Sequence, residues 1–264
     1  MRFVDTHTHP TDEAFGGLDG LEGYVNRAVA AGVDRMLIAD VDSRERPAVF
    51  EAVRRYPGIL FPMIGLYPGS VDENWRDELD QVHGIKSDQC AEGSRRFVAV
   101  GEIGLDYHEG KEFAAEQKEV LRLQLEMAAG LGLPVNIHLR DAWEDFFAVL
   151  KDCRHLHLRG NLHCFTASYE IYERANRYAD FSVGIGGVVT FKNASLPQAV
   201  AKIPLEKILL ETDAPYMAPA PLRGTRNESA NIPLIAAKVA EVKGLDIEAV
   251  AAATTANAER LFGI

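Results

Sequence analysis

The stretch FVDTHTHP, residues 3–10, places a carboxylate and two imidazoles at alternate positions, Asp5, His7 and His9. The apolar pair before Asp5 favours a strand, and a strand directs residues i, i+2 and i+4 to the same face. One face of this strand would therefore carry three polar groups where a core would take Leu or Val. Imidazoles and carboxylates are ligands of zinc, manganese and magnesium in different mixtures, so we expect His7 and His9 to hold a metal.

Four further acidic or imidazole side chains occur late in apolar segments, namely Glu102, His138, His163 and Asp213. Glu102 is the hardest to explain as a core residue, because acidic side chains are almost never fully buried unless paired. A lone buried histidine is more often hydrogen-bonded than metal-bound. The HLHL stretch at 155–158 repeats the HxH spacing, but it precedes a strand and carries little weight as a ligand site. The six groups together predict a metal centre with enough ligands for two ions.

An alternation of short apolar strands and amphipathic helices must position these side chains. A helical pattern over 112–132 is the clearest, because its apolar residues share one side and a glycine follows. About eight strand–helix units in a chain of 264 residues predict an α/β fold, a (β/α)8 TIM barrel forming a single domain over 1–264, with the metal site at the carboxyl-terminal rim of the strands. A doubly wound open sheet is the alternative. The predicted strands cover 2–9, 34–40, 59–66, 97–106, 133–139, 160–165, 180–187 and 207–213.

Composition narrows the class of protein. Hydrophobic residues make up 47% and charged residues 25%, which is enough apolar side chain for a sizeable core. The net charge of -11 disfavours broad binding to nucleic acid or anionic membranes, so a phosphate-bearing substrate would need local cations. The three cysteines, Cys90, Cys153 and Cys164, are too few and too scattered for a disulfide framework, which fits a cytoplasmic location. We expect no membrane segment and no obligate protein partner.

Eight stretches in the order of the chain carry a family resemblance. The sequence resembles the TatD family of metal-dependent hydrolases, a branch of the amidohydrolase-like barrels. The matching stretches are FVDTHTH at 3–9, VGEIGLDYH at 100–108, PVNIHLRDA at 134–142, LHCFTAS at 162–168, TFKNA at 190–194, ILLETDAPY at 208–216, RNESANIP at 226–233 and TTANAERLFG at 254–263.

The resemblance implies two divalent metal ions per chain, zinc, magnesium or manganese. His7, His9 and Asp213 would hold one ion, His138 and His163 the second, and Glu102 would bridge them. Two dications ~3.5–4 Å apart activate a water and clamp a phosphoryl group. Asp213 and Glu102 are the catalytic residues of this scheme, with Asp213 orienting the water and taking its proton.

The implied reaction is phosphodiester hydrolysis, an exonuclease-like cleavage of DNA or RNA, which makes the protein a probable deoxyribonuclease with nucleic acid as substrate. Two alternatives remain. The first is hydrolysis of another ester or amide bond at the same two-metal site, for example D-aminoacyl-tRNA deacylation, which the acidic charge favours slightly. The second is a metal-binding protein without catalysis.

Other residues are candidates for supporting roles. Asp5, Asp106 and Glu211 could orient the ligand imidazoles, and Cys164 should point away from the site because it follows His163 on a strand. Cations after the strands could contact phosphate, and the glycines of VGIGGVVT at 183–190 give a weak phosphate-binding signal. Tyr67, in GLYPGS, stands where the family usually has a histidine. The candidate substrate-binding residues are Tyr67, Arg140, Lys192 and Arg226, with Arg223 as a further cation.

Overall fold

Eight parallel strands in chain order form the centre of the molecule in a computed structural model, which describes residues 1–85, 97–108 and 110–264. Each strand pairs with the next one along the chain. Cys90 lies outside the described residues. The strands are β1 (Phe3–Thr8), β2 (Val33–Ile38), β3 (Leu60–Ile64), β4 (Ala99–Asp106), β5 (Val135–Arg140), β6 (Arg159–Leu162), β7 (Asp180–Ile185) and β8 (Ile208–Leu210).

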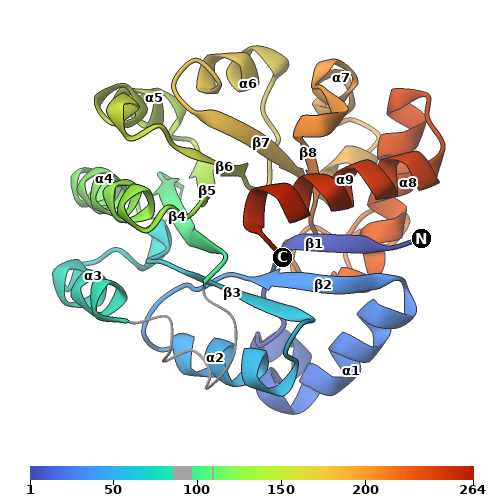
Figure 1. Cartoon of the computed structure of the whole chain (residues 1–264), viewed down its shortest axis with the longest axis horizontal. Coiled ribbons are helices and arrows are strands. Elements are labelled where there is room, and N and C mark those ends of the chain that lie inside the picture. The colour runs from blue at the N-terminus through green and yellow to red at the C-terminus, as the bar shows by residue number, and fades with distance from the viewer. Residues whose placement is uncertain (86–96, 109) are drawn as a thin grey trace.

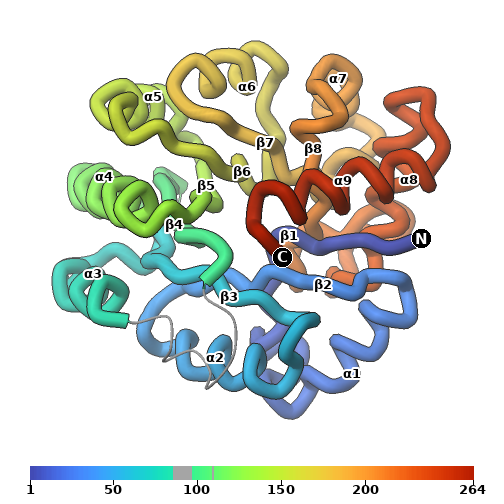
Figure 2. The backbone as a smooth tube through the Cα atoms, in the orientation of Figure 1, coloured from blue at the N-terminus to red at the C-terminus, as the bar shows by residue number. Residues whose placement is uncertain are grey.

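The last strand returns to the first. A parallel bridge joins Thr8 of β1 to Ala214, just beyond β8, so the sheet closes into a barrel. Figure 2 follows the chain once around this ring. The predicted (β/α)8 barrel is confirmed, and the alternative of an open, doubly wound sheet is wrong.

Helices cover the outside of the barrel (Figure 1). In the described residues one α-helix follows each strand from β1 to β7, the two after β6 and β7 being short, and two follow β8. Their apolar faces pack on strands that are buried along almost their whole length, as expected for parallel strands covered by helices. The helices are α1 (Gly17–Ala30), α2 (Arg46–Arg55), α3 (Trp75–Gly84), α4 (Ala114–Leu131), α5 (Trp143–Asp152), α6 (Tyr169–Ala175), α7 (Leu196–Lys202), α8 (Ile232–Lys243) and α9 (Ile247–Phe262).

Helix α9 lies across the amino-terminal ends of the strands (Figure 1). Asn257 donates to the carbonyl of Ile208 at the start of β8, and Thr255 donates to Arg2 just before β1. Phe262 joins an apolar cluster with residues of the barrel strands. This end is therefore closed, which leaves the carboxyl-terminal rim for a site.

All eight predicted strands are longer than the observed ones. β1 ends at Thr8, β6 at Leu162 and β8 at Leu210, so His9, His163 and Asp213 lie in the connections just beyond the strands. Asp213 has a left-handed backbone with φ 55°, which only a turn can accommodate. Among the described residues, no helix is both long and apolar enough to cross a membrane.

Candidate metal centre

The six predicted metal ligands converge at the carboxyl-terminal rim. His7 is in β1, Glu102 in β4 and His138 in β5, while three others follow the ends of strands. Five of the six are within 4 Å of at least two of the others, counted between side-chain nitrogen and oxygen atoms, and His138 is within 3 Å of Glu102. Strands far apart in sequence therefore deliver one cluster of imidazoles and carboxylates.

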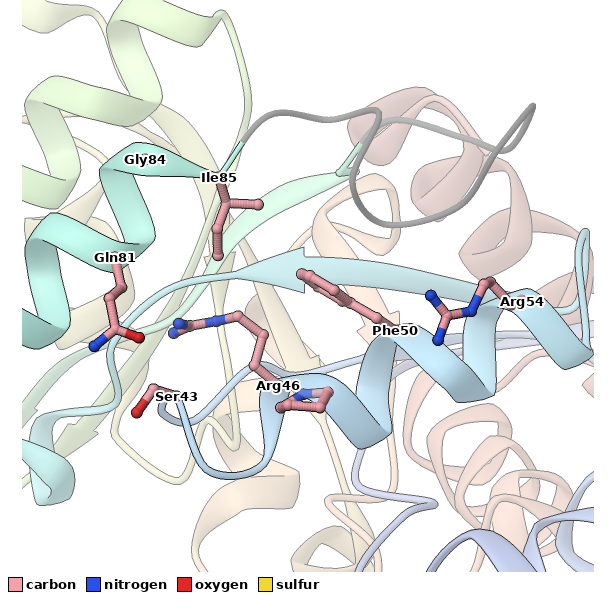
Figure 3. Close-up of a pocket in the computed structure, with 8 residues that line it drawn as sticks. Ser43, Arg46, Phe50, Arg54, Gln81, Gly84 and Ile85 are labelled. Atoms are coloured by element: carbon pink, nitrogen blue, oxygen red, sulfur yellow. The ribbon is translucent and has the colours of Figure 1, made fainter.

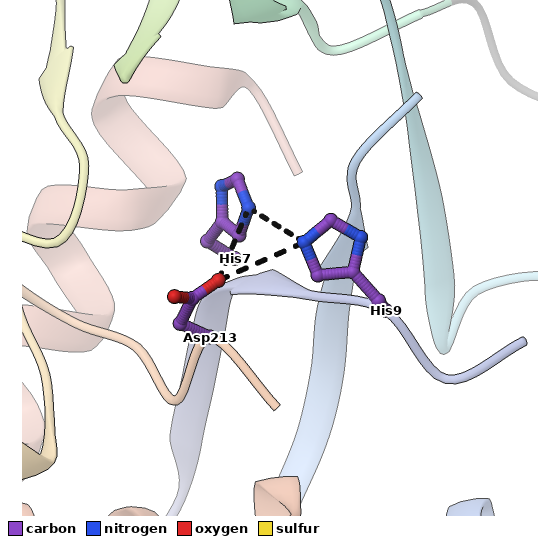
Figure 4. Close-up of side chains that lie close together, drawn as sticks. All are labelled: His7, His9 and Asp213. Carbon is purple, nitrogen blue, oxygen red and sulfur yellow. Dashed lines mark hydrogen bonds and ion pairs between the residues drawn. The ribbon is translucent and has the colours of Figure 1, made fainter. Parts of the chain in front are cut away.

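His7, His9 and Asp213 form a triad of facing donor atoms (Figure 4). The Nε2 atoms of the two histidines are 3.2 Å apart, and Asp213 Oδ1 is 3.8 Å from His7 Nε2 and 3.7 Å from His9 Nε2. Two nitrogens and one carboxylate oxygen around a common point are a donor set that suits a divalent cation. The residues present therefore fit a metal at this point.

Glu102 lies between two groups of imidazoles. Its Oε2 is 3.2 Å from His7 Nε2 and 3.7 Å from His9 Nε2. Its Oε1 is 2.7 Å from His138 Nδ1 and 3.6 Å from His163 Nε2. The two oxygens of one carboxylate thus face different ligand pairs, which is the arrangement a bridging carboxylate requires. His7 also stacks on His163, with ring centroids 3.5 Å apart, so the two groups adjoin each other.

The far nitrogen of three ligand imidazoles faces a buried oxygen. A hydrogen bond to such an oxygen orients the rings of His7 and His138, whereas Glu211 faces His163 as an ion-pair partner. Asp106 and Glu211 occupy the orienting positions predicted for them. Asn136 on β5 was not predicted, although an asparagine inside the apolar stretch PVNIHL was a visible signal. The pairs are His7 Nδ1 with Asn136 Oδ1 at 3.0 Å, His138 Nε2 with Asp106 Oδ2 at 2.9 Å and His163 Nδ1 with Glu211 Oε1 at 2.8 Å.

Asp5 supports the site through the backbone and does not orient an imidazole ring. It is fully buried and accepts hydrogen bonds from the N–H groups of His7 and Thr212 and from the hydroxyls of Thr212 and Ser229. These bonds tie the end of β1 to the segment that follows β8. Burial nevertheless raises the pKa of the Asp5 carboxyl to about 6, against the effect of these donors.

Mutual attraction of the charged groups perturbs their pKa values in the absence of a cation. Burial acts to lower the pKa of His7 and His138, but neighbouring carboxylates outweigh it and raise these values to about 9 and about 10. Burial acts to raise the pKa of Glu102 and Asp213, but the imidazoles outweigh it and lower both. Protons on the imidazoles therefore balance the carboxylates, and a divalent cation would take over that role.

A cavity of about 500 Å³ opens onto this cluster. Tyr67 and Arg140 line it, together with Asp12, Glu45 and Tyr216. The Tyr67 hydroxyl lies 3.4 Å from Asp106 Oδ2, and its ring meets the His138 ring edge to face. Two of the four predicted substrate-binding residues are therefore in the cavity beside the metal ligands.

The other predicted cations are not among the residues that line this cavity. Lys192 is exposed after β7. Arg226 donates to the carbonyl of Ala14 and lies over the Phe15 ring, and Arg223 lies over the Phe191 ring.

Cys164 does not point away from the site, so that prediction is wrong. The residue lies two positions after the end of β6 and has a left-handed backbone with φ 46°, which interrupts the alternation of a strand. Its thiol lies near His163 and Asp213 and lines the cavity. Burial, followed by the carboxylates of Asp213 and Glu211, raises the pKa of the Cys164 thiol.

The glycines of 183–190 serve packing. A Cβ at Gly184 would lie 1.8 Å from Glu211 Oε2, and one at Gly187 would lie 2.0 Å from the carbonyl oxygen of Met217. Gly184 therefore makes room for the carboxylate that faces His163.

In the HLHL stretch, both histidines are exposed.

A second cavity, of about 510 Å³, lies between α2 and α3 (Figure 3). Arg46 and Arg54 line it with Phe50 and Gln81, and none of the predicted site residues does. Arg46 Nε donates to Asp40 at 2.8 Å, and the Asp40 carbonyl in turn accepts the backbone N–H of Glu102. A buried ion pair thus supports the backbone of Glu102 from outside the metal-ligand cluster.

Comparison with known proteins relates the whole chain to one family. A family model described as TatD related DNase matches residues 4–263. A Bacillus subtilis protein described as the uncharacterized metal-dependent hydrolase YabD is 36% identical, over 98% of both chains. The Escherichia coli K12 protein YcfH, with the same description, is 40% identical over 100% of this chain and 97% of its own.

Relatives with a named activity and a solved structure are also similar. The 3'-5' ssDNA/RNA exonuclease TatD of Citrobacter koseri is 34% identical over 92% of this chain and 93% of its own. The crystal structure of YjjV, a TatD homolog from Escherichia coli K12, superposes with a TM-score of 0.89 at 28% identity, covering 100% of this chain and 98% of that one.

Proposed function

Because this chain belongs to the TatD family of metal-dependent hydrolases, we propose that it hydrolyses phosphodiester bonds at an end of single-stranded DNA or RNA. Relatives named as 3'-5' ssDNA/RNA exonucleases support this substrate class. The structural observation that carries the proposal is Glu102, whose two oxygens face different imidazole pairs. Such a carboxylate suits two cations close together, a common arrangement in enzymes that cleave phosphodiesters.

The proposed ligand set divides the six residues between two divalent cations. His7, His9 and Asp213 would hold one, and His138 and His163 the other, with Glu102 contacting both. Zinc, magnesium or manganese held there would supply Lewis-acid activation of water and neutralise charge on the phosphoryl group. The buried partners of the three oriented rings would keep the ligand nitrogens in place.

Asp213 is the proposed proton acceptor. Its side chain is 17% exposed, whereas that of Glu102 is 4% exposed, so Asp213 is the more accessible of the two to a water in the cavity. Its lowered pKa keeps it ionised near neutral pH, as a base must be. Asp213 would orient the attacking water, take a proton from it and pass the proton toward the leaving oxygen.

Arg140 and Tyr67 are the proposed substrate contacts in the cavity. Arg140 can pair with a phosphate, which the carboxylates around it would otherwise repel. Tyr67 offers a hydroxyl donor and an aromatic face on which a base can stack. Lys192 and Arg226, outside the cavity lining, would contact more distant phosphates of the same strand.

One observation favours the alternative of ester or amide hydrolysis. Two carboxylates, Asp12 and Glu45, line the same cavity. Two carboxylates in the cavity repel a phosphate and attract a protonated amino group. An aminoacyl ester carries such an amino group. Hydrolysis of an aminoacyl ester is therefore the second candidate function.

A substrate panel separates these candidates. The protein loaded with manganese, magnesium or zinc would be incubated with end-labelled single-stranded DNA and RNA, duplex DNA, an aryl phosphodiester, an aryl ester and an aminoacyl-tRNA. We expect stepwise release of nucleotides from the single strands, and its loss in the Asp213→Asn variant. Cleavage of esters alone would support the second candidate, and no turnover of any substrate would support a non-catalytic metal-binding protein.

A further inference from the structure

Cys164 presents a thiol beside the metal ligands. One donor atom each from His163, Cys164 and Asp213 lies within 4.8 Å of the other two. His163 Nε2 and Asp213 Oδ1 are 3.6 Å apart. The thiol also lines the cavity, so an ion that enters can reach it.

The connection after β6 holds this thiol in a fixed relation to the His163 ring. Glu211 Oε1 accepts the backbone N–H of Cys164 at 2.5 Å and lies 2.8 Å from His163 Nδ1. Asn161 donates to the other oxygen of the same carboxylate. The buried Glu211 carboxylate therefore holds both the Cys164 backbone and the His163 ring in place. The left-handed backbone of Cys164 then directs its side chain toward the predicted ligands.

A thiolate changes which cations such a cluster prefers. Imidazole and carboxylate accept manganese, magnesium or zinc, whereas a thiolate favours soft or borderline ions such as zinc and cadmium. We propose that Cys164 is a reserve metal ligand, which joins His163 and Asp213 around a thiophilic dication and makes this side of the centre select zinc or cadmium over magnesium and manganese. The thiol would release its proton to the solvent as the sulfur–metal bond forms. The inference rests on the metal centre of the proposed function and adds a ligand to it.

Cadmium titration of the metal-free protein tests the inference without an activity assay. Bound thiolate gives an ultraviolet sulfur-to-cadmium charge-transfer band, which imidazole and carboxylate ligands do not give. We expect this band in the wild type, its retention in the Cys90→Ser Cys153→Ser double variant and its loss in Cys164→Ser. Cys164→Ser should also weaken cadmium binding by at least about tenfold, because loss of a residue that only supports a ligand already costs about 10–100-fold in metal affinity, while manganese binding is unchanged.

The possible results separate failure of the Cys164 proposal from failure of the proposed metal centre. A wild type that binds cadmium without the band would overturn the role of Cys164 and leave the centre standing, and failure to bind any dication would overturn both. If Cys164→Ser does not fold, alkylation of the wild type replaces it. Cadmium should then protect Cys164 from iodoacetamide in peptide mass spectra, and equal modification with and without cadmium would refute the proposal.

Discussion

At the residue scale, the rings of His7, His138 and His163 each contact two kinds of neighbour through their two nitrogens. One ring nitrogen faces the cluster centre, and the other faces an oxygen such as Asn136 Oδ1 or Asp106 Oδ2. Because a carboxylate oxygen only accepts, both nitrogens of His138 carry a proton in the metal-free protein, Nε2 toward Asp106 and Nδ1 toward Glu102. A cation would displace the proton on Nδ1, while Asp106 keeps the one on Nε2. The orientation of the predicted ligand rings therefore depends on residues outside the predicted ligand set.

Asp213→Asn tests the proton-transfer role. Loss of general base help alone costs about 10²–10⁴ in rate, and the weaker metal ligand adds to this. We expect kcat on single-stranded DNA to fall by at least two orders of magnitude while the circular dichroism spectrum is unchanged. A variant that keeps more than about a tenth of the wild-type rate would show that Asp213 does not have this role.

Tyr67→His tests the departure from the family pattern. A histidine there can carry a positive charge near neutral pH, whereas a tyrosine offers a neutral hydroxyl. We expect kcat/KM on a short single-stranded oligonucleotide to rise by about tenfold, the scale of one improved hydrogen bond of ~1.4 kcal/mol. Metal content should be unchanged and must be matched between the two proteins. Equal or lower kcat/KM would mean that Tyr67 does not limit cleavage.

Residue types predicted the cluster but not all of its neighbours. His7, Glu102 and Asp213 stood out because polar groups at the ends of apolar strands are costly without a function. The predicted direction of the Cys164 side chain is wrong, because strand alternation cannot predict a left-handed residue two positions after the strand. A polar Asn136 in an apolar strand indicates a buried hydrogen bond, but the sequence does not indicate that its partner is the His7 ring.

At the level of elements, the barrel brings together predicted metal ligands that lie up to 206 positions apart in the sequence, from His7 to Asp213. Eight apolar segments bounded by glycine, proline or charged residues were enough to predict the number of strands and the barrel fold. The ends of β6 and β8 could not be predicted, because the short turns after them continue with residues typical of strands. Those turns depend on contacts between strands, such as the one between β7 and Glu211.

Gly184→Ala tests the packing between β7 and the segment after β8. The new Cβ would lie 1.8 Å from Glu211 Oε2, so this carboxylate must move away from His163 and Cys164. We expect a lower thermal unfolding midpoint and weaker zinc binding by calorimetry. Gly130→Ala in α4, where a Cβ meets nothing within 4 Å, serves as the control. It should leave zinc binding unchanged and should not lower the midpoint, because alanine is the better helix residue. An unaltered zinc affinity in Gly184→Ala would contradict the role given to Glu211.

For the whole molecule, the metal-free protein should become less stable as the pH rises. The pKa values of His7 and His138 rise on folding from 6.5 to about 9 and about 10. A raised pKa contributes stability that is complete below the unfolded value and is lost as the pH passes through the folded value. The carboxylates whose pKa is lowered, Glu102 and Asp213, are already ionised in this range.

Calorimetry of the metal-free protein between pH 6.5 and 10 should therefore show a falling unfolding midpoint. Saturating zinc should reduce this fall, because a bound cation replaces the protons and stabilises the folded state by mass action. A midpoint that is constant or rises with pH in the metal-free protein would contradict the charge balance described for the cluster.

The proposed function depends on a rim that holds two divalent cations per chain, and the metal content of the protein measures this. The protein would be supplied in turn with zinc, manganese and magnesium, dialysed exhaustively and measured by elemental analysis, beside a His7→Ala His9→Ala double variant shown to be folded. Because a two-metal site places its ions on separate ligand sets, we predict about two ions per wild-type chain and about one per variant chain. A wild-type protein that retains none of these metals, or a variant that retains as much metal as the wild type, would contradict the claim.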